Sequence, residues 1–342
     1  MTEHPPTDTV KPVTISYIAQ TAGVSIPTVS KVINGRSGVA AETRARVEAL
    51  ISQYGYRKSN PVQRTNLMEL VVDDLEHMWG LEIIRGVQHV VREHRVGLVL
   101  TEFGPDRNTI RYWIDDTIAR RPDCIVTVAQ LSDTEQNQLR ARGIPFVVLD
   151  PASEFPEDVP FVGATNWAGG RSATRHLAGL GHRDIAMISG PGHLYCQARV
   201  DGHRSALQAA GLPIRDHDII RAPLTEDGGH GTALELLNRP QRPTAIFAGN
   251  DLQAVGVYRA ARERGLRIPD DLSVVGFDDL PIAAMIDPGL TTVHQPLTEM
   301  AMAATELALA LGRGEPVSQT GIELATKLVI RGSTAPRAPA KS

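Results

Sequence analysis

Apolar positions near the start of the chain recur at helical spacing in three short segments. The first segment opens at Thr14 and ends at Gly23, a residue that suits the left-handed conformation of a helix C-cap. The second follows at once, with Ser25 as its N-cap and Gly35 as its terminator, and a third covers residues 41–54. The pattern therefore predicts a small all-α unit of three helices.

The pattern changes from Leu67 onward, where short apolar runs alternate with amphipathic stretches. Near-continuous apolar strands that alternate with helices indicate parallel sheets covered on both faces. A Pro-containing break over 151–160 predicts two such doubly wound lobes. The expected strands are 68–72, 97–101, 124–128, 146–149, 185–189, 245–248 and 273–277, and the expected helices are 81–94, 134–142, 168–180, 197–210, 229–238 and 251–264.

Charge is distributed unevenly along the chain. The net charge is −4, yet residues 11–64 hold eight Lys and Arg against two Glu. A compact basic unit suits a polyphosphate partner, because neutralising phosphates releases condensed counterions. Charge alone predicts partners loosely, and chance variation of the surface would explain the same numbers.

The sequence offers little for an enzyme. It has no G-x-G-x-x-G after the first strand, no G-x-x-x-x-G-K-[ST], no H-E-x-x-H and no G-x-S-x-G. The two cysteines lie far apart and the eleven histidines show no ligand spacing, so we expect no catalytic residue, metal or cofactor. Because no basic leader or long apolar segment is present, we expect a cytoplasmic protein without a membrane partner.

The three-helix segment carries a more specific motif. Residues 14–35 read Thr-Ile-x-x-Ile-Ala-x-x-Ala-Gly-Val-Ser-x-x-Thr-Val-Ser-Lys-Val-Ile-Asn-Gly, and the motif ends in Tyr54-Gly55-Tyr56. This motif closely resembles the helix-turn-helix head of LacI/GalR repressors, in which the second helix lies in the major groove of DNA.

The resemblance places Ile26, Pro27 and Lys31 at base-reading positions. Ile26 and Pro27 can offer only apolar contact, whereas Lys31 can reach guanine O6 or N7. Short polar residues around them suit phosphate contacts, although Ser25 also suits helix capping. The expected DNA-binding residues are Thr14, Ser25, Ile26, Pro27, Thr28, Ser30, Lys31, Asn34, Arg57 and Val62.

The segment after the head departs from the family. The resemblance implies a hinge helix that wedges a leucine into the minor groove. Here Val62 stands at the small hinge position and Thr65 stands where the leucine is expected. The departure puts the wedge in question.

The remainder of the chain resembles the effector domain of the same family, which is built like a periplasmic sugar-binding protein. The resemblance rests on Leu177 to Ala186, Arg199-x-x-Gly202, 247–256, 268–279 and 290–296. It implies effector contacts from Arg199 and Asp251. In open parallel sheets a ligand also lies beyond the carboxyl ends of the strands, where further acids occur. These acids are Asp73, Asp150 and Asp278, and each of them could equally cap the loop that follows its strand.

Aromatic side chains in the strand-to-helix loops favour a ligand that stacks. A pyranose presents an apolar face together with many hydroxyls, so a sugar is the first choice and a purine the second. The expected effector-binding residues are Asp73, Trp79, Phe103, Trp167, Tyr195, Arg199, Asn250, Asp251 and Asp278.

Together these features predict a DNA-binding regulator, a repressor of carbohydrate uptake or catabolism genes. The expected partners are palindromic double-stranded operator DNA, a small sugar effector and a second copy of the chain, with 81–91 as the dimer interface. A solute-binding protein or an enzyme of similar α/β fold is the more remote alternative. The expected domains are a disordered 1–12, the head 13–57, a linker 58–66, the two-lobed body 67–332 (lobe 1: 67–160 and 293–318; lobe 2: 161–290 and 319–331) and a disordered tail 333–342.

Overall fold

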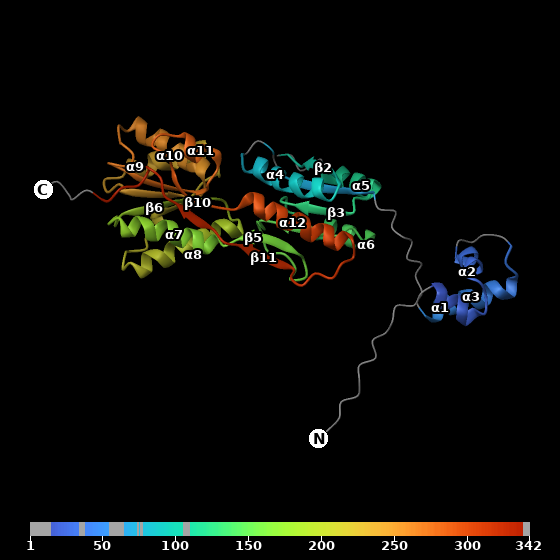
Figure 1. Cartoon of the computed structure of the whole chain (residues 1–342). Coiled ribbons are helices and arrows are strands. Elements are labelled where there is room, and N and C mark those ends of the chain that lie inside the picture. Colours follow the sequence, from blue (N-terminus) through green and yellow to red (C-terminus); the bar gives the residue numbers. More distant parts are fainter. Residues whose placement is uncertain are drawn as a thin grey trace, which may run out of the picture. The chain divides into compact units, whose positions relative to one another are not determined.

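The structure is a computed structural model that describes residues 15–33, 38–54, 65–73, 75, 78–104 and 110–337. The chain divides into two compact units, residues 1–64 and 65–342, here called the head and the body (Figure 1). The described elements of the head are α1 (Ile15–Ala22), α2 (Ile26–Ile33) and α3 (Ala41–Gln53).

The three helices of the head pack around the apolar positions that the periodicity marked. Ile18, Val29 and Val47, one from each helix, are fully buried together. Gly23 has a positive φ of 67°, a conformation that costs glycine little, and it ends α1 so that α2 can begin three residues later. The three-helix prediction is confirmed.

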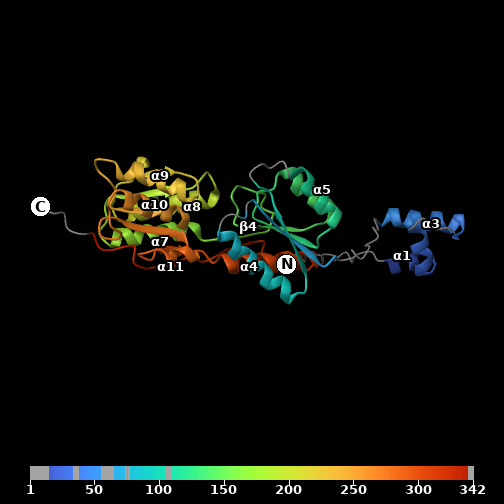
Figure 2. The same cartoon turned by 90° about the horizontal axis from the view of Figure 1, so that it is seen from above.

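The body consists of two lobes, each with a sheet of six strands (Figures 1 and 2). The sheet of lobe 1 has the order β11 (Gly321–Leu324), β5 (Phe161–Ala164), β4 (Phe146–Leu149), β3 (Cys124–Thr127), β1 (Leu67–Val72), β2 (Gly97–Glu102). The sheet of lobe 2 has the order β12 (Lys327–Val329), β10 (Thr291–His294), β9 (Ser273–Asp278), β8 (Ala245–Ala248), β6 (Ile185–Ser189), β7 (Ile219–Arg221). All pairings are parallel except that of β10 with β12.

Helices cover both faces of each sheet, as parallel sheets require. In lobe 1, α4 (Met78–Glu93) and α12 (Leu297–Gly312) cover one face, and α5 (Ile110–Arg120) and α6 (Asp133–Arg142) cover the other. In lobe 2, α9 (Glu226–Leu237), α10 (Asp251–Glu263) and α11 (Pro281–Met285) lie on one face, and α7 (Asn166–Gly179) and α8 (Leu194–Ala209) lie on the opposite face. A short 3₁₀ turn (Asp216–Asp218) precedes β7.

Every strand and helix expected in the body is present, but several elements were missed. The missed elements are β5, β7, β10, β11, β12, α5, α11 and α12. The strands among them are only three or four residues long, too short for a clear alternation. Helix α12 is apolar over much of its circumference, because it packs both on the sheet and against α4 beside it, so its helical period is weak.

The boundary between the lobes differs from the expected one. The expectation assigned 161–164 and 321–324 to lobe 2, but β5 pairs with β4, and β11 pairs with β5, in the sheet of lobe 1. Conversely, His294 of β10 stays in lobe 2. The chain crosses between the lobes after β5, after β10 and after β11, and such late crossings are set by strand pairing, which local pattern does not encode.

The linker and the C-terminal tail are both shorter than expected. Thr65 donates from its hydroxyl to the Arg121 carbonyl at 2.8 Å, so residues 65 and 66 are part of the body. Ser333 is fully buried, and Arg337 donates its backbone N–H to the Leu180 carbonyl, so residues 333–337 are ordered against lobe 2. The predictions for 1–12 and 338–342 fall outside the described residues.

Within the part of the chain described, no helix has both the length and the apolar character needed to cross a bilayer.

Candidate functional site

A cavity of about 300 Å³ lies between the two lobes, at the carboxyl ends of their strands. We call it the central cavity. Asp73 follows β1 in lobe 1, and Asn250 follows β8 in lobe 2. Both positions adjoin the point where the strand order of their sheet reverses, which is where open α/β sheets bind ligands. The cavity is lined by Asp73, Trp79, Ile83, Val128, Asp150, Ala152, His193, Tyr195, Arg199, Leu224, Asn250, Asp278, Gln295 and Leu297.

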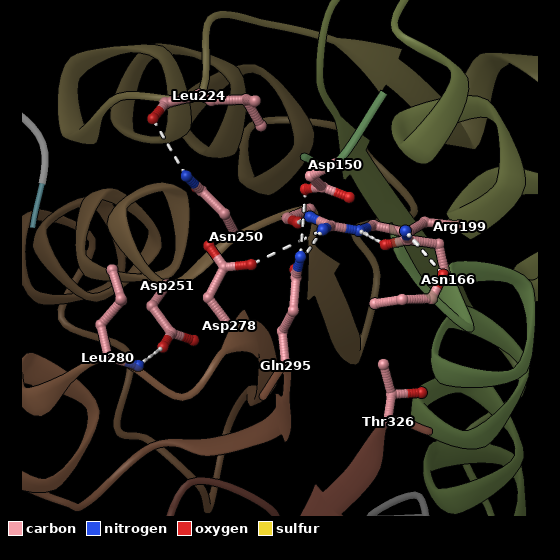
Figure 3. Close-up of polar contacts among 12 residues, drawn as sticks. Asp150, Asn166, Arg199, Leu224, Asn250, Asp251, Asp278, Leu280, Gln295 and Thr326 are labelled. Atoms are coloured by element: carbon pink, nitrogen blue, oxygen red, sulfur yellow. Dashed lines mark hydrogen bonds and ion pairs between the residues drawn. The ribbon is translucent and has the colours of Figure 1, made fainter. Parts of the chain in front are cut away.

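Arg199 is the centre of a buried hydrogen-bond network (Figure 3). Its Nε donates to Asn166 Oδ1 at 2.8 Å, its Nη1 donates to the Gly249 carbonyl at 2.7 Å, and its Nη2 donates to Gln295 Oε1 at 2.8 Å. The Gln295 amide in turn donates to Asp150 Oδ2 at 3.0 Å. Because Asp150 ends a strand of lobe 1 and Arg199 belongs to lobe 2, this network ties the lobes together through a crossing segment.

Two helices packed at backbone contact hold Arg199 in place. A side chain at Gly170 of α7 would collide with the Arg199 carbonyl, and one at Gly202 of α8 would collide with the Trp167 carbonyl. Glycine is therefore needed at both positions for α7 and α8 to approach this closely. The guanidinium also stacks on the Phe277 ring, 3.7 Å from its centroid.

The cavity holds more negative than positive charge. Arg199 Nη2 lies 3.6 Å from Asp278 Oδ1, so one guanidinium faces two carboxylates, the buried one of Asp278 and the partly buried one of Asp150. Burial raises the pKa of Asp150, an effect that Arg199 and Gln295 oppose. Burial raises the pKa of Asp278 to about 7 despite the nearby Arg199. Carboxylates that lack a full set of protein donors can accept hydrogen bonds from the hydroxyls of a ligand.

Asn250 lines the cavity but is already engaged by the protein. Its Oδ1 accepts the Gln253 backbone N–H at 2.9 Å, which caps α10, and its Nδ2 donates to the Leu224 carbonyl at 3.1 Å. Asn250 therefore holds the start of α10 and the Leu224 segment together at the cavity wall, and one of its amide hydrogens remains for a ligand.

Three rings add apolar surface to the same cavity. Trp79 from α4 is half-buried on the lobe 1 side. Tyr195 and His193 stack on one another with centroids 5.2 Å apart at the start of α8 in lobe 2. The central cavity thus combines acceptors with aromatic faces from both lobes.

Six of the expected effector residues meet in the central cavity, and three do not. Asp73, Trp79, Tyr195, Arg199, Asn250 and Asp278 line it. Phe103 is a core residue of lobe 1, where its ring packs against that of Trp113 with centroids 5.1 Å apart. Trp167 lines a neighbouring cavity instead.

Asp251 is the clearest correction among the expected contacts. It is fully buried, and its carboxylate accepts from the Leu280 N–H at 2.7 Å and from the Thr292 hydroxyl at 2.5 Å, as Figure 3 shows for Leu280. Asp251 follows a strand, as effector residues do, but its side chain turns into lobe 2 and joins α11 to the sheet. The resemblance suggested an effector contact where the structure has an internal brace.

Gln295, His193 and Asn166 were missed as site residues. Gln295 follows β10, a strand that the pattern did not mark, and the alternation in Thr291-Thr292-Val293-His294 before Gln295-Pro296 was the available signal. His193 and Asn166 lie at the starts of α8 and α7, and their importance comes only from tertiary proximity to Arg199 and Tyr195.

The head presents the second helix of its helix-turn-helix with an exposed N-terminal surface. Ile26, Pro27 and Lys31 are exposed, and Ile26 keeps 46% of its surface accessible, which is unusual for isoleucine. The Ser25 hydroxyl accepts the Thr28 N–H at 3.3 Å, so Ser25 caps α2. Thr28 and Ser30 are partly exposed on the same helix, and Thr14, Asn34, Arg57 and Val62 lie outside the described residues.

Comparisons with known proteins cover both units. Residues 14–59 match the family "Bacterial regulatory proteins, lacI family", and residues 174–334 match "Periplasmic binding protein-like domain". The ribose operon repressor of Escherichia coli K12 is 31% identical over 328 residues, which cover 94% of this chain and 99% of the repressor.

Two solved structures extend the comparison to three dimensions. A complex of the transcriptional regulator CelR with cellobiose superposes with a TM-score of 0.74 at 31% identity, covering 94% of this chain and 99% of CelR. The lac repressor dimer bound to operator and the anti-inducer ONPF gives a TM-score of 0.70 at 26% identity, covering 95% and 100% of the two chains.

Proposed function

The chain belongs to the LacI family of bacterial transcriptional regulators, and from this premise we propose that it represses carbohydrate uptake or catabolism genes under the control of a sugar. The sugar binds in the central cavity and changes the affinity of the protein for its operator. As a member of this family, the chain is a regulator rather than an enzyme.

The observation that carries the sugar proposal is the composition of the central cavity. Asp73, Asp150 and Asp278 supply hydrogen-bond acceptors from both lobes, and Trp79 and Tyr195 supply aromatic faces. A sugar ring matches such a site, because its hydroxyls donate to carboxylates while its C–H faces lie on aromatic rings. The relatives support the same class, since one is a ribose operon repressor and another was solved with cellobiose.

The switch follows from the position of the Arg199 network. A ligand with different affinity for two lobe angles shifts the population between them. Gln295 lies in a segment that crosses between the lobes, and it forms hydrogen bonds with both Arg199 and Asp150. A sugar that binds Asp150 or Asp278 therefore alters the hydrogen bonds that hold this crossing segment. The lobe angle then sets the spacing of the two heads of a dimer.

We propose that the protein is a homodimer that reads a palindromic operator. A small head offers few base contacts, so two heads on two half-sites supply the affinity that one lacks. Leu81 on α4 keeps 59% of its surface exposed, and β2, which packs beside α4, is an edge strand with Leu100 41% exposed. An apolar edge strand of this kind is usually covered by a partner.

A thermal-shift screen of the full-length protein tests the effector class. The set contains D-ribose, D-glucose, D-galactose and their oligosaccharides, with purines as a comparison set. A ligand that binds only the native state raises the melting temperature, so we expect a shift with a sugar and none with a purine. The same sugar should change the affinity for operator DNA, measured by fluorescence anisotropy.

Trp79→Ala supplies the site control, since Trp79 lines the central cavity. Tyr112→Ala is its match, because Tyr112 is an exposed aromatic residue of α5 that lines neither this cavity nor the neighbouring one. The sugar shift should vanish in the first variant and persist in the second. A shift with purines alone would contradict the sugar proposal.

A further inference from the structure

A second cavity of about 490 Å³ lies beside the central one, also between the lobes. We call it the side cavity. Its walls include Phe155 and Phe161 from lobe 1 and Trp167 and Leu194 from lobe 2, with Glu323 at β11. Among these residues, only Trp167 was expected to contact a ligand, and it is absent from the lining of the central cavity.

The two cavities share a wall, which we call the partition. Both are lined by Asp150 and Tyr195. In two segments, neighbouring residues line different cavities. Pro151 lines the side cavity and Ala152 the central one, and likewise Leu194 lines the side cavity and His193 the central one.

The partition is itself a contact between the lobes. The Leu194 N–H donates to the Ala152 carbonyl at 2.8 Å, which joins the start of α8 to the loop after β4. Because these two segments belong to different lobes, moving the lobes apart would break this hydrogen bond and join the side cavity and the central cavity into one elongated cleft.

The side cavity has the chemistry of a carbohydrate subsite. Trp167 keeps 47% of its surface exposed, and Arg171 lies over its ring at 5.8 Å from the centroid. Phe155 and Phe161 pack edge to face with centroids 5.2 Å apart. The Glu323 side chain is exposed and has no hydrogen-bond or ion-pair partner in the described part of the protein, so it is available to accept from hydroxyls.

We propose that the side cavity is a second saccharide subsite, which holds the further units of an oligosaccharide whose first ring lies in the central cavity. This inference rests on the proposed sugar-sensing function and narrows the effector to a chain longer than one unit. Trp167 stacks on a sugar ring in this subsite, and Glu323 accepts hydrogen bonds from its hydroxyls. The ligand crosses the partition beside Asp150 and Tyr195, so it binds only when the Leu194–Ala152 contact opens.

Isothermal titration calorimetry of the full-length protein with sugars of increasing length tests the subsite. The probes are glucose, maltose, maltotriose, cellobiose and cellotriose. For the wild type we expect a di- or trisaccharide of one linkage to bind at least tenfold more tightly than glucose. Trp167→Ala should remove this gain and leave the affinity for glucose unchanged.

Three further variants sharpen the test. Trp167→Phe keeps an aromatic face and should retain most of the gain. Ala168→Trp fills the side cavity from the exposed start of α7, so it should block the longer sugars without affecting glucose. Tyr112→Ala, outside both cavities, should behave like the wild type.

The outcomes separate the inference from the function on which it rests. Binding of glucose without any gain from longer chains overturns the subsite alone. An equal loss of glucose and oligosaccharide affinity in Trp167→Ala also overturns it, because the residue would then act through the central cavity. If the wild type binds none of these probes but does bind a monosaccharide of the thermal-shift set, the subsite is tested, and overturned or kept, with oligosaccharides of that sugar; if no sugar of either set binds, both the subsite and the sugar-sensing function fail.

Discussion

Individual side chains decide which residues at strand ends meet a ligand. Asp251 and Asp278 both end strands of lobe 2 or follow them directly, yet Asp278 lines the central cavity and Asp251 is buried behind it. The difference lies in their hydrogen-bond partners, because Leu280 and Thr292 each donate a hydrogen bond to one of the two carboxylate oxygens of Asp251. Arg199 similarly donates most of its hydrogen bonds to protein acceptors, so its main role is to stabilise the cavity wall rather than to bind the effector.

Asp251→Ala should destabilise the protein more than it changes effector recognition. The substitution leaves a buried N–H of Leu280 and a buried hydroxyl of Thr292 without an acceptor, which costs about 1 to 3 kcal/mol for each group. Urea denaturation followed by circular dichroism measures the loss. Asp270→Ala, which removes an exposed ion pair with Arg267, is the matched control and should cost less than about 0.5 kcal/mol. Equal stabilities of the two variants would argue against the brace.

Asp278 should make the stability of the protein depend on pH. Its pKa is raised from 3.8 in the unfolded chain to about 7 in the folded protein, so the native state holds a proton that the unfolded state has lost in this range. Stability from this group is therefore present at low pH and is lost as the pH rises through about 7. The effect is at most on the order of a few kcal/mol.

Denaturation of the wild type and of Asp278→Asn between pH 4 and 8 tests this pKa. The amide resembles the protonated acid and does not titrate, so the variant should lose less stability than the wild type as the pH rises. Asp270→Asn should follow the wild-type profile. Parallel profiles for the wild type and Asp278→Asn would show that Asp278 ionises normally in the folded protein.

Lys31 is the residue of the head for which we predict base recognition. Lys31→Ala should weaken binding to the preferred operator by about 1 to 3 kcal/mol and affect non-operator DNA much less. Arg46→Ala removes an equally exposed positive charge from α3 and should weaken both kinds of DNA alike. Fluorescence anisotropy with an operator selected from random DNA measures both. A uniform loss for Lys31→Ala would place that side chain on the phosphates.

At the scale of elements, the contact between α7 and α8 sets the geometry of the site. Asn166 begins α7 and Arg199 lies in α8, so their hydrogen bond depends on the separation of the two helix backbones. Gly170 and Gly202 permit that separation. The same pair of helices also carries Trp167 and Leu194 of the side cavity, so both cavities depend on one packing contact.

Gly202→Ala should push α8 away from α7 and disturb Arg199. The added methyl group would meet the Trp167 carbonyl and the Arg171 backbone nitrogen, neither of which can move without its helix. We expect a loss of about 1 to 3 kcal/mol of stability together with weaker effector binding. Gly179→Ala is the control, because a methyl group there would lie in open space. A Gly202→Ala variant with wild-type melting temperature and effector affinity would contradict this account.

For the molecule as a whole, the proposed dimer couples the lobes to the operator. Leu81→Arg places a charge on the exposed face of α4 and should convert dimers to monomers in analytical ultracentrifugation. Operator affinity should fall at least a hundredfold, because a monomer engages a single half-site. Tyr112→Arg, an equally drastic change on α5, should remain dimeric. A dimeric Leu81→Arg protein would move the interface elsewhere.

The sequence alone determined the elements whose signals are local. The helices of the head follow from their apolar period and from Ser25 and Gly23 at their ends, and the buried strands of the body follow from their apolar runs. The resemblance of the chain to its family followed from motifs of contiguous residues, such as 14–35. These features depend on neighbours within a few residues, which is the range that a local pattern covers.

Only the tertiary structure decided the division of the lobes and the membership of the site. β11 joins lobe 1 by pairing with β5, which lies about 160 residues earlier in the chain, and Gln295 reaches Asp150 and Arg199 only after both lobes have formed. The same holds for the opposite fates of Asp251 and Asp278, since both are acids at strand ends. Which of them meets the cavity depends on donors supplied by α11 and β10, and no local pattern records where those donors lie.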